Sequence, residues 1–256
     1  MRFTIITPTH KRADKLTRAI ESVLGQTYAE WRMIIVNDSP EDISYAPLEQ
    51  DIADRRITYL KNEENSGVNF SRNRALDIAV RDSDWVIFLD DDDYLTPDAL
   101  ATLHDLILAH PKETWFVTNR AYASGKSATK FPKPDTTYSY AWDYLITKKG
   151  EGDATHCINA KIVTNVRFST RIKQAEEWIF FFQIGLKTHM FYSPHNSTLT
   201  DGYDEASGLN FRTRPRKKQL EMLSLIAQEG FNLHLLYHPT FCIYLLLRFV
   251  RLSIKG

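Results

Sequence analysis

The sequence predicts an α/β protein in which a mostly parallel, Rossmann-like sheet is flanked by helices and followed by a helical C-terminal appendage. Apolar residues recur at helical spacing in residues 16–24, and we expect Ser71 and Thr96, the latter followed by Pro97, to cap two further helices. Strands that alternate with helices favour a parallel sheet covered on both faces. Short apolar runs with the length of buried strands occupy residues 3–7, 33–36, 57–60, 85–89 and 115–118.

Length and composition limit the classes of protein to consider. The 256 residues allow one large α/β domain, or one domain and a short appendage, and a formal net charge of zero gives no overall sign of a nucleic-acid partner. Cys157 and Cys242 form neither a disulfide framework nor a paired zinc motif, so a reducing, cytoplasmic setting is expected. We expect no signal peptide, because strand-like sequence begins at Phe3, and no segment is apolar for long enough to span a bilayer as a helix.

Acidic turns follow two of the predicted strands, where parallel sheets collect their ligands. One is Asn37-Asp38, and the other is the run from Asp90 to Asp93, whose four charges repel one another unless cations share the space. Oxygen ligands suit Mg²⁺ or Mn²⁺, ions that bridge carboxylates to a diphosphate. A calcium loop would need Gly and Glu where Leu95 and Ala101 stand, so that interpretation fails. A solvated turn that caps the next helix is the structural alternative.

Five segments of the first 110 residues or so resemble, in order and spacing, the family 2 glycosyltransferases, which are inverting enzymes of the GT-A fold. The resemblance implies transfer of a sugar from a nucleoside-diphosphate sugar to a hydroxyl of a glycan or lipid-linked glycan, as in the synthesis of bacterial polysaccharide, lipopolysaccharide or capsule. The segments are Ile5-Ile6-Thr7-Pro8-Thr9-His10, Gln26-Thr27-Tyr28, Val36-Asn37-Asp38-Ser39, Asn65-Ser66-Gly67-Val68 with Ser71-Arg72-Asn73, and Phe88-Leu89-Asp90-Asp91-Asp92-Asp93 with Pro97 beyond.

The resemblance also implies where the nucleotide lies. Asp38 would accept the N3 hydrogen of uracil or thymine, which predicts a UDP- or TDP-linked donor. Asn37 stands where the family usually has an acidic residue, and it could bond to a ribose hydroxyl. Arg72 could reach the base or the diphosphate, or it could be an ordinary surface arginine of a helix. The other nucleotide-binding candidates are Pro8, Thr9, His10, Arg12, Asn65, Asp90 and Asp91.

A divalent ion, Mn²⁺ or Mg²⁺, is implied by the DXD pair of Asp90 and Asp92. By resemblance Asp92 binds the metal, and Asp90 contacts the sugar, the ribose or a metal-bound water. Asp91 could replace either, because the run permits sliding by one residue. Similar enzymes often carry a late histidine that touches the metal or diphosphate, which makes His195 a further candidate, although a lone histidine is more often structural.

Inverting transfer needs a carboxylate that takes the acceptor's proton while its oxygen attacks the anomeric carbon. The segment Gln174-Ala175-Glu176-Glu177-Trp178 resembles the acidic pair that opens a helix in the second half of family members. Matching the pair places the base at Glu177, where the family usually has the shorter Asp, with Glu176 as the reserve candidate. Stabilisation of the helix N-terminus is the alternative role for these glutamates.

We expect residues 1–205 to form the GT-A catalytic domain, with a nucleotide-binding half over about 1–110 and an acceptor half over about 111–205. Residues 206–256 form a basic and apolar C-terminal segment with helices near 216–228 and 233–253. The stretch 241–254 combines apolar residues with Arg248 and Arg251, which suits an anionic membrane surface on the inner face of the cell membrane. Packing of this helix on the core is the alternative.

Two other classes of function compete with glycosyl transfer. A sugar-phosphate nucleotidyltransferase has similar architecture but usually opens with a glycine-rich basic loop, and residues 8–12 contain no glycine. A non-catalytic module that binds a nucleotide sugar or glycan is the third hypothesis, and the pair Glu176-Glu177 argues against it.

Overall fold

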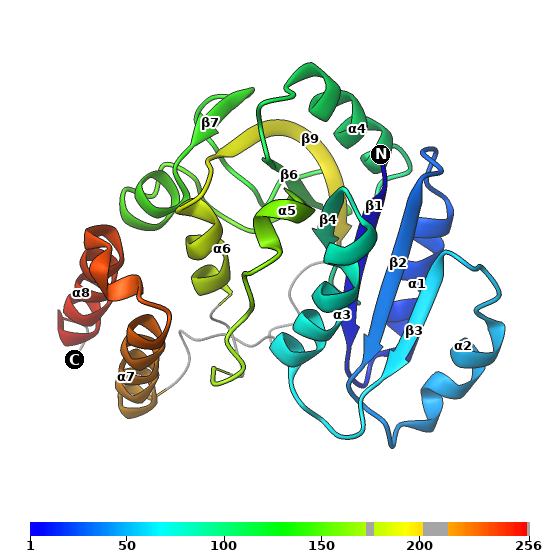
Figure 1. Cartoon of the computed structure of the whole chain (residues 1–256), viewed down its shortest axis with the longest axis horizontal. Helices are drawn as coiled ribbons and strands as arrows, with labels where there is room; N and C mark the ends of the chain where they lie inside the picture. The colour runs from blue at the N-terminus through cyan, green and yellow to red at the C-terminus, as the bar shows by residue number, and fades with distance from the viewer. Residues whose placement is uncertain (173–176, 202–214, 255–256) are drawn as a thin grey trace.

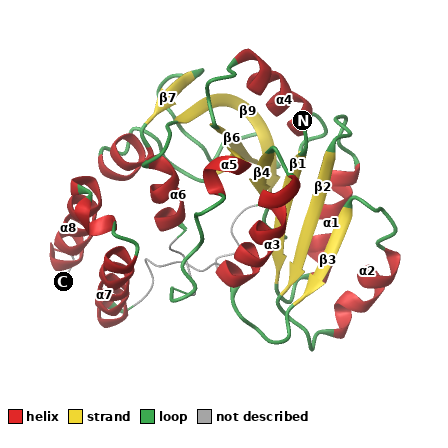
Figure 2. Ribbon diagram, in the orientation of Figure 1, coloured by secondary structure: helices red, strands yellow, loops and turns green. Residues whose placement is uncertain are grey.

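A computed structural model of the chain describes residues 1–172, 177–201 and 215–254 (Figure 1). Its elements alternate between strand and helix in the first half and become less regular in the second (Figure 2). They are β1 (Phe3–Thr9), α1 (Ala13–Leu24), β2 (Trp31–Asn37), the 3₁₀ helix η1 (Ile43–Tyr45), α2 (Ala46–Asp51), β3 (Ile57–Lys61), α3 (Val68–Asp82), β4 (Trp85–Phe88), β5 (Asp93–Leu95), α4 (Ala99–Ala109), β6 (Trp115–Tyr122), β7 (Thr136–Tyr138), the π-helix η2 (Tyr140–Ile146), β8 (Ala154–Asn159), α5 (Ala160–Val163), α6 (Trp178–Gly185), β9 (Met190–Thr200), α7 (Arg216–Asn232), the 3₁₀ helix η4 (Leu235–Tyr237) and α8 (Pro239–Ile254).

The described strands form one sheet in the order β3-β2-β1-β4-β8-β6-β9-β5, and β7 pairs with β9. Strands β1 to β4 are parallel, as the alternation of strands and helices predicted. Beyond them, β8 runs antiparallel to both β4 and β6, and β9 pairs antiparallel with β5 and β7 but parallel with β6. The α/β class is therefore confirmed, with the parallel part confined mainly to the N-terminal half.

Both faces of the sheet are buried. In β1, Ile5 packs with α1 and α4, whereas the adjacent Ile6 packs with α3, and both isoleucines are fully buried. Figure 1 shows α3 in front of the sheet and α1 behind it. Strands buried on both faces explain the continuous apolar runs in the sequence, because neither face has to be polar.

Two helices begin elsewhere than predicted. Helix α3 begins at Val68, so Ser71 lies inside it, and the backbone N–H groups of Ser66 and Gly67 just before it bond to the distant Asp38. Helix α4 begins at Ala99, and the Thr96 hydroxyl donates to the carbonyl of Asn196 instead of capping it. In both places a side chain far away in the sequence accepts from the first N–H groups instead, Asp38 at α3 and Gln26, through the Leu100 N–H, at α4.

The C-terminal helices α7 and α8 are present as predicted, and one side of them packs on the catalytic domain. Phe241 of α8 is fully buried, with its ring 5.5 Å from Trp178 and 5.2 Å from Phe182 of α6. Phe241 also rests on Gly230 of α7, where an added Cβ would lie 2.4 Å from the ring. The inner face of this segment therefore packs on the core, which was the alternative to membrane binding.

The expected domain boundary at residues 205 and 206 lies outside the described residues. Among the helices that are described, none has the length and apolar content that crossing a membrane requires.

Two phenylalanines of α8 provide a test of this packing. Phe241→Ala should lower the free energy of unfolding by about 3–5 kcal/mol, because it leaves a cavity among well-packed aromatic rings. Phe249→Ala on the same helix should cost less than about 1 kcal/mol, because its side chain is 52% exposed. Urea denaturation measures both, and equal losses would show that the inner face of α8 is not packed as described.

Candidate active site

The predicted site residues of the first half converge at the carboxyl ends of the parallel strands. Thr9 at the end of β1 pairs with Asn37 at the end of β2, and the run that follows β4 lies beside them. The Thr9 hydroxyl donates to the Asp91 carboxylate at 2.8 Å, which ties the first loop to the acidic turn. Strand register therefore brings together loops that the sequence separates.

Asp38 joins the end of β2 to the start of α3. Its buried carboxylate accepts hydrogen bonds from the Asn62 side chain at 2.6 Å and from the backbone N–H groups of Ser66 and Gly67 at 2.8 and 2.7 Å. Gly67 has a φ of 90°, a conformation that glycine adopts without strain. A carboxylate has about four acceptor sites, so Asp38 retains capacity for a hydrogen bond from a ligand.

The structure gives Asn37 a role in shaping the turn that carries Asp38. Its side chain is fully buried, donating to the Tyr59 hydroxyl at 2.9 Å and accepting from the Ser39 N–H at 2.7 Å. The amide retains one donor hydrogen and one acceptor site, so the contact with a ribose hydroxyl stays a prediction.

His10 and Asn65 lie on the exposed side of these loops. The His10 imidazole bonds through Nδ1 to the Ser39 hydroxyl at 2.7 Å, and its Nε2 lies 3.4 Å from the Asn65 amide. Pro8 and Thr9 are buried beneath them. The two exposed side chains are thus placed where a ligand at the strand ends could meet them.

The aspartate run alternates between open and buried side chains. Asp90 and Asp92 are 45% and 31% exposed, whereas Asp91 and Asp93 are 7% and 6% exposed. Burial raises the pKa of Asp91 to about 6 in spite of its bonds to Thr9 and Arg12. Burial likewise raises the pKa of Asp93, against the opposing charge of Arg120. Asp90 and Asp92 are therefore the open pair of carboxylates. For Asp91 to replace either of them as a ligand, the turn would have to rearrange.

Three arginines hold six carboxyl groups around this turn, so the acidic side chains outnumber the basic ones by three. Arg12 contacts Asp91 and Asp92, Arg72 contacts Asp90 and Glu177, and Arg120 contacts Asp93 and Asp153, at distances from 2.5 to 3.2 Å. An excess of negative charge at an open turn favours a bound cation.

Arg72 links the acidic turn to the predicted base. Its side chain is 6% exposed, and its guanidinium lies 2.8 Å from Asp90 and 2.5 Å from Glu177, which stands at the start of α6. Burial alone would lower the pKa of Arg72, but the two carboxylates raise it above its ordinary value and keep it charged. Arg72 is therefore no surface arginine. Glu176, the reserve candidate for the base, lies outside the described residues.

The structure places His195 in the middle of β9, where its Nε2 is 3.6 Å from Asp98 beside the start of α4. The end of β9 at Thr200 is the part that pairs with Asp93. The role of His195 as a metal ligand stays a prediction, and its described contact is with Asp98.

Arg120 and Asp153 are site residues that the sequence reasoning missed. Arg120 lies on β6 and bonds to Asp93 at 2.7 Å and to Asp153 at 2.9 Å. The one local signal was a charged residue that follows the apolar run at the start of the strand. Its partners belong to other elements, so no spacing rule could have joined them.

The donor atoms at the turn fit a metal ion that is shared with a ligand. Among the described residues, no three His, Cys, Asp or Glu side chains are arranged to hold an ion by themselves. Mg²⁺ and related ions, however, are commonly bound through one or two carboxylates together with substrate phosphates. The open pair Asp90 and Asp92 matches that mode of binding.

This combination of fold and acidic turn belongs to the GT-A class. S. aureus TarS in complex with UDP-GlcNAc has the same fold, with a TM-score of 0.69 and 20% identity over 91% of this chain and 67% of that one. Residues 4–171 match the Glycosyl transferase family 2 pattern, and the chain belongs to this family.

Two curated relatives share much of the chain. The putative colanic acid biosynthesis glycosyl transferase WcaA of Escherichia coli is 39% identical over 194 residues, which is 71% of this chain and 65% of WcaA. A Campylobacter jejuni protein named GalNAc(5)-diNAcBac-PP-undecaprenol beta-1,3-glucosyltransferase is 27% identical over 71% of this chain and 60% of that one. The chain thus spans less than two thirds of the length of either relative.

Asp38 should be needed for both the loop and the nucleotide. Asp38→Ala should lower the free energy of unfolding by at least about 2 kcal/mol, because buried donors lose their acceptor. It should also weaken UDP binding roughly 10- to 150-fold if one charge-assisted bond to the base is lost. Asp105→Ala, at an 81% exposed position on α4, is the control. Unchanged UDP affinity by calorimetry would remove Asp38 from the nucleotide site.

Proposed function

We propose that the chain transfers a sugar, with inversion, from a UDP- or TDP-linked donor to a hydroxyl of a glycan or lipid-linked glycan. The observation that carries the proposal is the position of Arg72, which bonds to both the open acidic turn at Asp90 and the carboxylate of Glu177. Donor-binding and acceptor-activating groups of an inverting transferase must face one another across the reacting carbon. Family membership supports the same reaction.

UDP sugars are the first donors to test. The TarS structure that shares this fold was solved with UDP-GlcNAc, which supports a UDP-linked donor here without naming the sugar. The buried Asp38 carboxylate would accept the N3 hydrogen of uracil or thymine, a donor that cytosine lacks. Incubation with a panel of nucleotide sugars and Mn²⁺ tests the proposal, because free nucleoside diphosphate indicates transfer or hydrolysis, whereas pyrophosphate would indicate a nucleotidyltransferase.

The chemical step proposed for the protein's own residues is a single displacement. Glu177 takes the proton of the acceptor hydroxyl as that oxygen bonds to the anomeric carbon, and the bond from this carbon to the donor's phosphate oxygen breaks, so that the nucleoside diphosphate leaves. Arg72 holds the Glu177 carboxylate in place. A Mn²⁺ or Mg²⁺ ion held by Asp92 and Asp90 would act as a Lewis acid that offsets charge on the diphosphate.

The acceptor proposed is part of a surface polysaccharide, made on the cytoplasmic side of the cell membrane. The name of the Escherichia coli relative refers to colanic acid, and that of the Campylobacter jejuni relative refers to an undecaprenol-linked glycan. Both names support a glycan or lipid-linked acceptor. Arg248 and Arg251 lie on the same helix as the exposed Leu246 and Phe249, which supports peripheral attachment to an anionic membrane surface.

Loss of the metal ligand should abolish transfer. Asp92→Ala should reduce the rate of transfer by about 10²-fold or more, because charge on the leaving diphosphate is no longer offset. The fold should be unchanged, since Asp92 is partly exposed, and Asp105→Ala serves as the control. Mn²⁺ titrations in the presence of UDP report binding directly. Full activity of the unaltered protein in the presence of a chelator would contradict the metal mechanism.

Removal of the base should separate donor binding from transfer. Glu177→Gln preserves the shape of the side chain but cannot take a proton, so transfer should fall by about 10²–10⁴-fold. The affinity for UDP should stay near that of the unaltered protein. Glu176→Gln is the matched control, and an inactive Glu176→Gln beside an active Glu177→Gln would move the base by one residue.

A further inference from the structure

The α7–α8 pair has one face turned to the catalytic domain and another turned away. Its inner face is fixed by Phe241, which is buried against Trp178, the residue that follows the predicted base. On the outward side, Leu246 and Phe249 of α8 are 61% and 52% exposed. Exposed apolar side chains that gather on one surface mark interaction sites.

An apolar groove runs between the two helices on the outward side. It encloses about 470 Å³, within the range of about 300–1,000 Å³ typical of ligand sites. Ser224 is the one polar side chain among the described residues that line it, so a bound peptide would bury backbone groups without partners. A hydrocarbon chain has no such groups. The lining residues are Leu220, Leu223, Ser224, Ala227, Leu245, Leu246 and Phe249.

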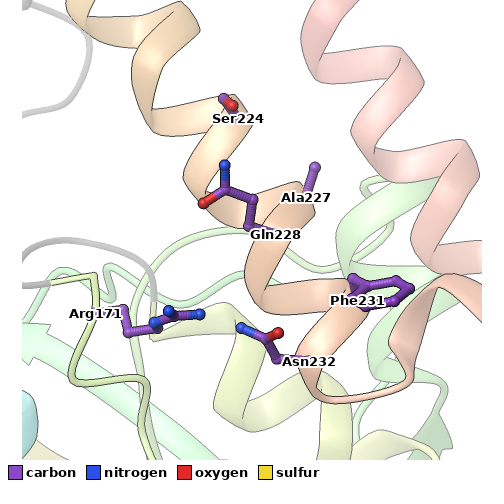
Figure 3. A pocket seen from close by; sticks show the side chains of 6 residues that line it. All are labelled: Arg171, Ser224, Ala227, Gln228, Phe231 and Asn232. Carbon is purple, nitrogen blue, oxygen red and sulfur yellow. The ribbon is translucent and has the colours of Figure 1, made fainter.

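A polar pocket of about 460 Å³ continues from this groove, since Ser224 and Ala227 line both. Figure 3 shows Arg171 facing the side of α7 that carries Gln228 and Asn232. The Arg171 guanidinium has five N–H donors, and the carboxylate of the buried Glu229 lies 4.0 Å from it. Arginine and amide donors together suit a phosphate group, whose oxygens accept several hydrogen bonds.

The polar pocket lies close to the catalytic site through the segment that carries Arg171. The Asn69 side chain of α3 donates to the carbonyls of Ser169 and Ile172 at 2.9 Å each, which fixes the chain on both sides of Arg171. Arg72, one turn further along α3, contacts Glu177. The segment that carries Arg171 is therefore tied to the same helix that carries Arg72.

We propose that the groove and the pocket together bind a prenyl-type lipid phosphate, the carrier portion of a lipid-linked acceptor. The hydrocarbon chain lies between α7 and α8, and the phosphate lies at Arg171. The basic residues Arg216, Lys217 and Lys218 at the start of α7 add positive charge at the other end of the helix. The inference rests on the proposed function, because it assigns a place to the acceptor of that reaction.

Calorimetry with soluble farnesyl phosphate tests the site without a membrane. The unaltered protein should bind farnesyl phosphate at least about tenfold more tightly than farnesol or inorganic phosphate, because each probe lacks one half of the ligand. Leu246→Gln and Arg171→Gln should each weaken binding by about tenfold. Leu225→Gln is the matched control, because Leu225 is 41% exposed on α7 and does not line the groove. It should bind as the unaltered protein does.

Three results would overturn the inference. Inorganic phosphate that binds as tightly as farnesyl phosphate would show that the groove takes no chain, and an Arg171→Gln variant that binds normally would remove the phosphate site. Binding to phosphatidylglycerol vesicles without binding to farnesyl phosphate, lowered equally by Leu225→Gln and Leu246→Gln, would show a general membrane surface. UDP binding is measured on the same samples, so failure of the proposed function is seen separately.

Discussion

The buried guanidinium of Arg72 is the interaction on which the arrangement of the site depends. A buried charge is tolerated only when it is paired, and Arg72 is paired with carboxylates from both halves of the chain, Asp90 after β4 and Glu177 at the start of α6. The acidic turn and the start of α6 are therefore held together by ion pairs, in addition to the packing of α3 and α6 in a shared core.

The parts of the fold that were predicted correctly are those governed by local pattern. Strands β1, β2 and β4 are buried on both faces, so their apolar runs were readable, and α1 buries Leu16, Ala19, Ile20 and Val23 at helical spacing. The antiparallel pairings of β8 and β9 were not predicted, because strand direction is fixed by which distant segments pair with them. The start of α3 was misplaced for a similar reason, since Asp38 provides its hydrogen bonds from another loop.

The site residues also divide into those that lie in short sequence motifs and those that only the fold brings together. The acidic turn and Glu177 could be located because they lie in short motifs whose order resembles one family. Arg120 could not, because its role exists only where β6 brings it to Asp93 at the start of β5. For His195 the sequence carries no information about its distance from the turn, and the contact with Asp98 depends on where β9 lies in the fold.

The hydrogen bond that closes the aspartate turn has a consequence for how the turn can change in length. The Asp93 N–H donates to the Asp90 carbonyl at 3.1 Å, so the four aspartates form one tight turn between β4 and β5. Asp91 is held by Thr9 and Asp93 by Arg120, two residues from different strands. A residue inserted into the turn or deleted from it would break this closure and pull at least one buried carboxylate away from its partner. The number of residues in this connection is therefore fixed by contacts on both sides of it.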